Sequence, residues 1–148
     1  MTLAQKLAEL KSIFIDTAPV IYHIEAHPEY GPLMKDIVKR IQSGNLIAYT
    51  TVVTITEVLP KPVSLHKEEL VQQFIEFFKK GENINLLEIS SDIAEGASRL
   101  RGKYEFLKTI DALQISASIS VKADAFLTND IKLKNINENN IIVLKDFI

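Results

Sequence analysis

Short runs of β-forming apolar residues alternate with amphipathic helical patterns along this 148-residue chain, and this alternation limits the possible folds. The pattern predicts helices over residues 32–43, 51–59, 64–80 and 110–122, with a further helix that starts at Ser91. The predicted strands cover residues 12–15, 46–49, 84–89, 125–128 and 141–144. Strands that alternate with helices form a parallel sheet covered on both faces. The sequence therefore predicts one α/β domain over residues 1–148, with a mainly parallel sheet of about five strands.

The composition is that of an ordinary globular domain, with 47% hydrophobic and 24% charged residues. The chain has no cysteine, which excludes disulfides, thiolate zinc sites and cysteine nucleophiles and fits a reducing cytoplasm. Lys6, Glu9 and Lys11 interrupt the first apolar stretch, so it matches neither a signal peptide nor a membrane span. We expect a cytoplasmic protein without membrane association. With a net charge of −2, any nucleic-acid binding must depend on local charge.

Four acidic residues are expected where strands give way to helices: Asp16, Glu57, Asp111 and Asp130. Three of them have simple structural explanations. Asp16 is a good helix N-cap, Asp111 suits the positive end of a helix dipole, and Asp130 suits a turn. Glu57 is harder to explain, because its segment is apolar and a glutamate buried there without a cation would be unfavourable.

Taken together, the four carboxylates predict a metal site. Ligands bind outside the carboxyl ends of the strands in open α/β sheets, and these acids are expected to meet there. Without a cation they would repel one another and raise one another's pKa values. Mg²⁺ or Mn²⁺ prefers such oxygen ligands, and the corresponding chemistry is metal-assisted hydrolysis of a phosphodiester.

Four segments of the sequence resemble the PIN-domain ribonucleases, most closely the VapC-type toxins of prokaryotic toxin–antitoxin pairs. The segments are Ile13-Phe14-Ile15-Asp16-Thr17, the stretch from Thr50 to Leu59, Thr109-Ile110-Asp111-Ala112-Leu113-Gln114, and the stretch from Ala123 to Asp130. The resemblance implies a three-layer α/β/α fold and a metal-dependent endoribonuclease. It implies that Asp16, Glu57, Asp111 and Asp130 bind Mg²⁺ or Mn²⁺. It also implies that the Thr128 hydroxyl lies beside the metal site, and Thr17 is a weaker candidate for the same role.

The same resemblance implies an RNA substrate, an antitoxin protein as partner and a homodimer. The apolar stripe from Leu70 to Phe78 is then either core or dimer contact. The chain departs from the family pattern at Ala18-Pro19, where many toxins carry asparagine or serine, and at Ile110, where many carry proline. Neither departure removes a predicted metal ligand.

Basic residues before Asp111 form a second candidate site. Six residues lie close together here: Arg99, Arg101, Lys103, Tyr104, Phe106 and Lys108. The basic side chains could steer RNA phosphates while Tyr104 or Phe106 stacks a base. Alternatively, the basic side chains are solvated charges at the end of a helix. His23 and His27 are not expected to bind a metal. Asp124 precedes a strand, so we expect it at the opposite edge of the sheet, in local turn chemistry.

Two other functional classes remain open. A non-catalytic PIN-like module could use its acidic pocket for binding alone. A response-regulator-like phosphoacceptor domain is also α/β with acids at strand ends, but it would usually carry adjacent acids after the first strand, where this chain has Asp16-Thr17.

Overall fold

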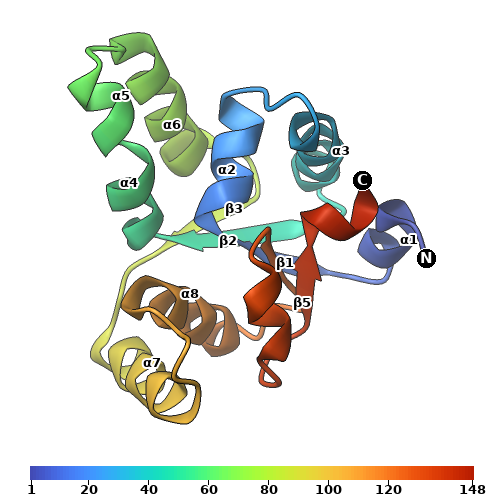
Figure 1. Cartoon of the computed structure of the whole chain (residues 1–148). Coiled ribbons are helices and arrows are strands. Elements are labelled where there is room, and N and C mark those ends of the chain that lie inside the picture. The colour runs from blue at the N-terminus through green and yellow to red at the C-terminus, as the bar shows by residue number, and fades with distance from the viewer.

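The computed structural model describes residues 1–148 as a five-stranded sheet with helices on both sides (Figure 1). The strands are β1 (Ser12–Ile15), β2 (Ile47–Thr51), β3 (Ile84–Leu87), β4 (Phe126–Thr128) and β5 (Ile141–Val143). The α-helices are α1 (Leu3–Ala8), α2 (Thr17–Ile24), α3 (Tyr30–Gln42), α4 (Val52–Val58), α5 (Pro60–Ser64), α6 (Glu68–Lys80), α7 (Ser91–Lys103) and α8 (Thr109–Ser120). Two short 3₁₀ helices complete the chain, η1 (Ile131–Asn135) and η2 (Leu144–Phe147). No helix has the length and apolar character needed to cross a membrane.

The sheet has the strand order β3-β2-β1-β4-β5, and every neighbouring pair is parallel. The chain passes from β1 to β2 and β3 on one side, then returns to place β4 and β5 on the other side of β1. The strand order therefore reverses between β1 and β4, and open α/β sheets bind ligands at such a point.

Two apolar cores lie on opposite faces of the sheet and make the protein a three-layer α/β/α structure. Successive residues of a strand point to opposite faces, so Ile13 and Ile15 join one core and Phe14 joins the other. The first core includes buried residues of α1, α2, α3 and α6, and the second includes those of α7, α8 and η1. Figure 1 shows α2, α3 and α6 on one side of the sheet and α7 and α8 on the other. The predicted fold is confirmed.

The structure differs from the predicted elements at α1, at α5 and at the start of α6. The residues before β1 form α1. This helix begins with a capping box between Thr2 and Gln5, and it buries Leu3 and Leu7. Pro60 does not simply end a helix, because it stands in the first turn of α5, where its missing N–H is tolerated. The next helix then begins at Glu68 and not at residue 64.

The packing of α7 on α8 depends on a close contact at Gly96. A Cβ atom at this position would lie 2.4 Å from Ser116 Oγ, which is closer than real Cβ contacts allow. The Ser116 hydroxyl in turn donates to the carbonyl of Ile93 on α7, at 2.8 Å. This contact sets how closely α8, which carries Asp111 in its first turn, packs on α7.

Two stacked phenylalanines join the central strands. Phe14 of β1 and Phe126 of β4 are both fully buried and are paired in the strand register. Their ring centroids lie 5.2 Å apart with an interplanar angle of 4°.

We predict that Phe126→Ala lowers the free energy of unfolding by about 3–5 kcal/mol, as measured by urea denaturation. Phe106→Ala is the control, because Phe106 is exposed and its loss should change stability by less than about 1 kcal/mol. Equal losses for the two variants would contradict this account of the core.

Candidate active site

Asp16 lies at the carboxyl end of β1 and begins α2. Its side chain accepts a hydrogen bond from the Thr17 N–H at 2.8 Å, so it is the N-cap of this helix. Its second oxygen accepts a hydrogen bond from the Thr128 hydroxyl of β4, also at 2.8 Å. The Thr128 hydroxyl oxygen accepts the Asp130 N–H at 3.1 Å. Thr128 thus joins the two acidic positions across the central strand pair.

Asp130 follows β4 and begins η1. Its side chain accepts the Lys132 N–H at 3.0 Å, so the predicted turn chemistry is present. Asp130 is exposed, whereas Thr128 is buried. The structural explanation and the site explanation are therefore compatible for both Asp16 and Asp130, since each residue caps a helix at the edge where ligands bind.

Asp111 and Glu57 reach this edge by routes that the sequence did not predict correctly. Asp111 does not follow a strand: it lies in the first turn of α8, which is reached from α7. Glu57 lies near the end of α4, and its side chain is exposed and not buried. The expected unfavourable burial of Glu57 is therefore wrong. Thr54 and Val58 take the buried positions of this helix, so Glu57 faces outward.

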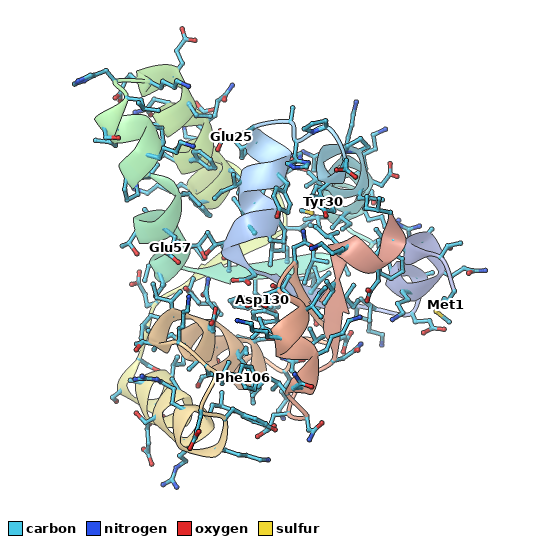
Figure 2. All side chains as sticks on the ribbon, viewed as in Figure 1. Met1, Glu25, Tyr30, Glu57, Phe106 and Asp130 are labelled. Carbon is cyan, nitrogen blue, oxygen red and sulfur yellow. The ribbon has the colours of Figure 1, made fainter.

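Three of the four carboxylates line one cavity of about 550 Å³. Its walls are formed by Glu57, Phe106, Lys108, Thr109, Ile110, Asp111, Asp130 and Lys132. Figure 2 shows that Glu57, Phe106 and Asp130 come from three separate parts of the chain: α4, the α7–α8 connection and the residue before η1. Asp16 is not among the lining residues, but its carboxylate is close enough to interact electrostatically with Asp111 and Asp130.

Burial and mutual repulsion raise the pKa values of the two less exposed acids. The pKa of Asp16 is raised to about 6, mainly by burial and further by the charges of Asp111 and Asp130, against the hydrogen bonds from Thr17 and Thr128. The pKa of Asp111 is also raised, first by burial and then by the charge of Asp130, while the Lys108 backbone and the charges of Lys108 and Lys132 oppose the shift. Carboxylates in this state gain from a nearby cation.

The donor chemistry at this edge fits a hard divalent cation. All the candidate groups are carboxylate oxygens, which Mg²⁺ and Mn²⁺ prefer, and Mg²⁺ usually takes only one or two carboxylates together with water. No three acidic or histidine side chains stand close enough together to form a complete metal site in this arrangement. A cation would therefore have to draw these side chains inward or complete its shell with water and substrate oxygens.

A buried polar network holds the supporting elements together beneath the site. The Thr51 hydroxyl donates to Gln114 Oε1 at 2.6 Å, and Gln114 Nε2 donates to Thr54 Oγ1 at 2.6 Å. Thr50 and Thr54 share a hydrogen bond of 2.9 Å, and Thr50 donates to the Ile15 carbonyl at 3.0 Å. Because the one Thr50 proton goes to Ile15, Thr54 must donate to Thr50. The chain of hydrogen bonds therefore links α8, which carries Asp111, and α4, which carries Glu57, to the end of β1, where Asp16 follows.

Sequence reasoning did not identify this network. Gln114 is fully buried, three residues after Asp111, and Thr54 is fully buried, three residues before Glu57. An amide on the buried face of a helix was the available signal, since such a group needs hydrogen-bond partners when it is removed from water.

The predicted RNA-binding cations do not line the cavity. Arg99 pairs with Glu95 at 3.0 Å, Lys103 pairs with Glu138 at 3.2 Å, and Arg101 is exposed near the end of α7. Lys108, which belongs to the same basic stretch, does line it, as does Lys132, which the sequence analysis missed. Lys132 follows Asp130 by two residues, and this spacing within the predicted turn was the signal.

The residues set aside in the sequence lie away from the acids. The Asp124 side chain accepts the N–H groups of Lys11 and Ser12 at 2.7 and 3.1 Å, so it ties down the start of β1 at the opposite edge. The ring of His27 accepts the N–H groups of Glu29 and Tyr30, each at 3.1 Å, at the beginning of α3. Asp124 lies at the opposite edge, as predicted, but the expected local turn chemistry is wrong, because its partners lie 113 and 112 residues earlier in the chain.

Comparisons with known proteins agree with this fold. The sequence model of the PIN domain matches residues 13–139. No curated protein sequence matches the chain. Among solved structures, DNA-bound VapBC from Salmonella typhimurium has a TM-score of 0.73 at 16% identity, covering 91% of this chain and 99% of that one. VapBC2 from Rickettsia felis, bound to a promoter DNA fragment, has a TM-score of 0.69 at 20% identity, covering 89% and 98%.

A third similar structure is VapC20 from Mycobacterium tuberculosis, described as a toxin that cleaves the sarcin–ricin loop. It has a TM-score of 0.68 at 11% identity, covering 86% of this chain and 98% of that one.

The match of the family model over most of the chain establishes the class: the chain belongs to the PIN domain family, a family of nucleases. The five-stranded parallel sheet between two helical layers is the fold of that family.

The raised pKa of Asp16 predicts how stability depends on pH when no metal is present. The folded protein holds the Asp16 proton up to about pH 6, whereas the unfolded chain loses it near 3.8, so folding becomes less favourable as the pH rises between these values. The loss is on the order of 3 kcal/mol and is complete above the folded-state pKa. Asp16→Asn removes this titration. In EDTA, the free energy of unfolding of the variant minus that of the wild type should therefore increase as the pH rises from about 3.8 to about 6. Urea denaturation at several pH values measures it, and a difference that does not change with pH contradicts the prediction.

The buried network predicts a large effect at Gln114. Gln114→Met keeps an apolar chain of similar length but leaves Thr51 and Thr54 without their partner, so we expect the free energy of unfolding to fall by about 2–4 kcal/mol. Adding Thr54→Val to this variant should cause a smaller further loss than Thr54→Val causes in the wild type, because the shared hydrogen bond is already absent. A double-mutant cycle by urea denaturation measures this coupling. Strict additivity would show that the two side chains do not interact.

Proposed function

We propose that this protein is a metal-dependent endoribonuclease and the toxin of a toxin–antitoxin pair. The observation that carries the proposal is the meeting of Glu57, Asp111 and Asp130 at one cavity, with Asp16 electrostatically coupled to the last two. The cavity lies outside the carboxyl ends of β1 and β4, where the strand order reverses, and this position supports a ligand site. Membership of a nuclease family supports hydrolysis of phosphodiester bonds.

In this proposal, Asp16, Glu57, Asp111 and Asp130 hold Mg²⁺ or Mn²⁺. The bound cation would supply an activated water and would stabilise the charge that develops on the phosphate. Thr128 holds the Asp16 carboxylate in place by its hydrogen bond and is itself fixed by the Asp130 N–H. Lys108 and Lys132 partly offset the negative charge at Asp111, so a phosphate can approach an otherwise acidic edge.

The partner in this proposal is an antitoxin protein. Similar folds occur in VapBC structures from Salmonella typhimurium and Rickettsia felis, which are described as bound to DNA. A homodimer is also proposed. The predicted apolar stripe on α6 does not decide this, because Val71, Phe74, Phe77 and Phe78 are buried within the domain.

The two alternatives differ in how well they fit the structure. The order 3-2-1-4-5 differs from the 2-1-3-4-5 order of response-regulator domains, so a phosphoacceptor of that class is disfavoured. A binding module without catalysis has the same fold and the same acids. Only activity distinguishes it from the proposed nuclease.

The proposed nuclease is tested by replacing one acid. We predict that Asp111→Asn lowers the rate of Mn²⁺-dependent cleavage of single-stranded RNA by at least about 100-fold, because a metal ligand and its charge are lost. Asp92→Asn is the matched control, since Asp92 occupies the first turn of α7 as Asp111 occupies that of α8, but does not line the cavity. Cleavage is followed on denaturing gels, with circular dichroism spectra to establish that both variants fold.

Two outcomes would overturn the proposal. Equal cleavage by Asp111→Asn and the wild type would remove the acids from the reaction. No metal-dependent cleavage by the wild type, over RNAs of varied sequence and structure, would favour the non-catalytic binding module. The toxin role is tested separately by expression in bacteria, where the wild type should arrest growth and Asp111→Asn should not.

A further inference from the structure

The acidic cavity has an exposed aromatic ring in its wall. Phe106 lies in the connection between α7 and α8, is 39% exposed, and lines the same cavity as Glu57, Asp111 and Asp130. It is the only phenylalanine among the exposed large hydrophobic residues of the chain. Figure 2 shows its position beside α8, in the part of the molecule that faces Asp130 and Glu57. The cavity therefore has an apolar ring beside its charged side chains.

The ring of Phe106 packs against a neighbouring aromatic ring. It meets the ring of Tyr104 edge to face, with centroids 5.9 Å apart. The Tyr104 hydroxyl donates to the Glu138 carboxylate at 2.6 Å, and the Lys103 ammonium pairs with the same carboxylate at 3.2 Å. These contacts fix Tyr104, and Tyr104 in turn limits the movement of Phe106. A ring held in this way loses little conformational freedom when a ligand stacks on it.

Two lysines of the same cavity form no salt bridge, although both act on the charge of Asp111. Lys108 precedes α8 and Lys132 lies in η1, both are exposed, and neither takes part in a salt bridge. Lys103 and Lys134, their neighbours in sequence, are both paired with acids. The cavity therefore combines unpaired cations, an aromatic face and carboxylates suited to a metal. This set of groups matches a nucleotide, with phosphates for the cations and a base for the ring.

Resting on the proposed function, we propose that the site takes single-stranded RNA, with one unstacked base on the face of Phe106 and the adjacent phosphates on Lys108 and Lys132. A base inside a duplex is already stacked on its neighbours, so its face is not free to meet the ring. Bases in loops and single strands can turn out and stack on aromatic side chains. Phe106 therefore selects unpaired RNA, and the basic residues Arg99, Arg101 and Lys103 are not needed for this contact.

The absence of tryptophan from the chain permits a direct test. Phe106→Trp introduces one fluorophore at the proposed stacking position, and stacking of a base on the indole should quench its emission. Ile119→Trp is the matched control, because Ile119 is 38% exposed against 39% for Phe106 and lies near the other end of α8 from Asp111. A single-stranded oligoribonucleotide of about ten residues is added in EDTA, so that binding is measured without cleavage. The same strand annealed to its complement is the duplex probe.

We expect the single strand to quench Phe106→Trp and to leave Ile119→Trp unchanged, and we expect the duplex to quench neither. Phe106→Ala should weaken binding of the single strand by about 5- to 150-fold, while Phe106→Tyr, which keeps an aromatic face, should stay close to the wild type. Phe106→Leu should behave like the alanine variant, because an apolar side chain without a ring cannot stack. Equal quenching by single strand and duplex, or unchanged affinity of Phe106→Ala, would overturn the inference.

The results also separate this inference from the proposed nuclease. If Phe106→Trp is quenched but the wild type cleaves no RNA, base stacking stands and the nuclease fails. If the wild type cleaves RNA with Mn²⁺ but Phe106→Ala binds and cleaves as well as the wild type, the nuclease stands and base stacking fails.

Discussion

The site depends on carboxylates of like charge being held together at the carboxyl edge of the two central strands. Asp16 is the centre of this arrangement, because burial and the charges of Asp111 and Asp130 all act against its ionised form. The hydrogen bonds from Thr17 and Thr128 support ionisation, but they do not outweigh burial. Below about pH 6 the folded protein therefore disfavours the ionised form of Asp16, and a nearby cation would favour it. This is a common property of functional sites, where stability is lost in exchange for reactivity.

The rest of the fold can be understood as the framework that maintains this arrangement. The Phe14–Phe126 stack joins β1 and β4 directly below the acids that follow these strands. The Gln114 network connects α8 and α4 to the end of β1 through buried hydrogen bonds. Such a network has a defined geometry because every member must keep its partner. It thereby fixes the relative positions of the elements that carry Asp111, Glu57 and Asp16.

Much of the fold could be predicted from the sequence, because strands buried on both faces and amphipathic helices leave clear patterns. Asp16 and Asp130 were located correctly, since acids that follow strands must lie at one edge of a parallel sheet. Glu57 lines the cavity with Asp111 and Asp130, but the burial that was expected of it is wrong. Its helix is apolar in sequence, but Thr54 and Val58 occupy the buried face and leave Glu57 exposed. Asp111 was also wrongly expected after a strand, although the predicted helices that start at Ser91 and Ile110 already placed it between two helices.

The side chains around the acids were harder to predict. Pairing partners such as Glu138 are distant in sequence, so the basic stretch could not be divided into paired and unpaired cations before the fold was known. Lys132 and Gln114 acquire their roles only when α8, α4 and η1 come together. The local signals, a lysine two residues after Asp130 and an amide on a buried helix face, did not show which distant residues these side chains would meet.

The most direct test of this account is the effect of Mn²⁺ on stability near neutral pH. A cation that binds only the folded protein raises the free energy of unfolding by RT ln(1 + [Mn²⁺]/Kd), which is about 2.7 kcal/mol at 100 times Kd. Thermal unfolding of the wild type should therefore move to higher temperature as Mn²⁺ replaces EDTA, and the shift should be largely lost in Asp16→Asn. An unchanged melting temperature of the wild type, or an equal shift in both proteins, would contradict a metal site centred on these acids.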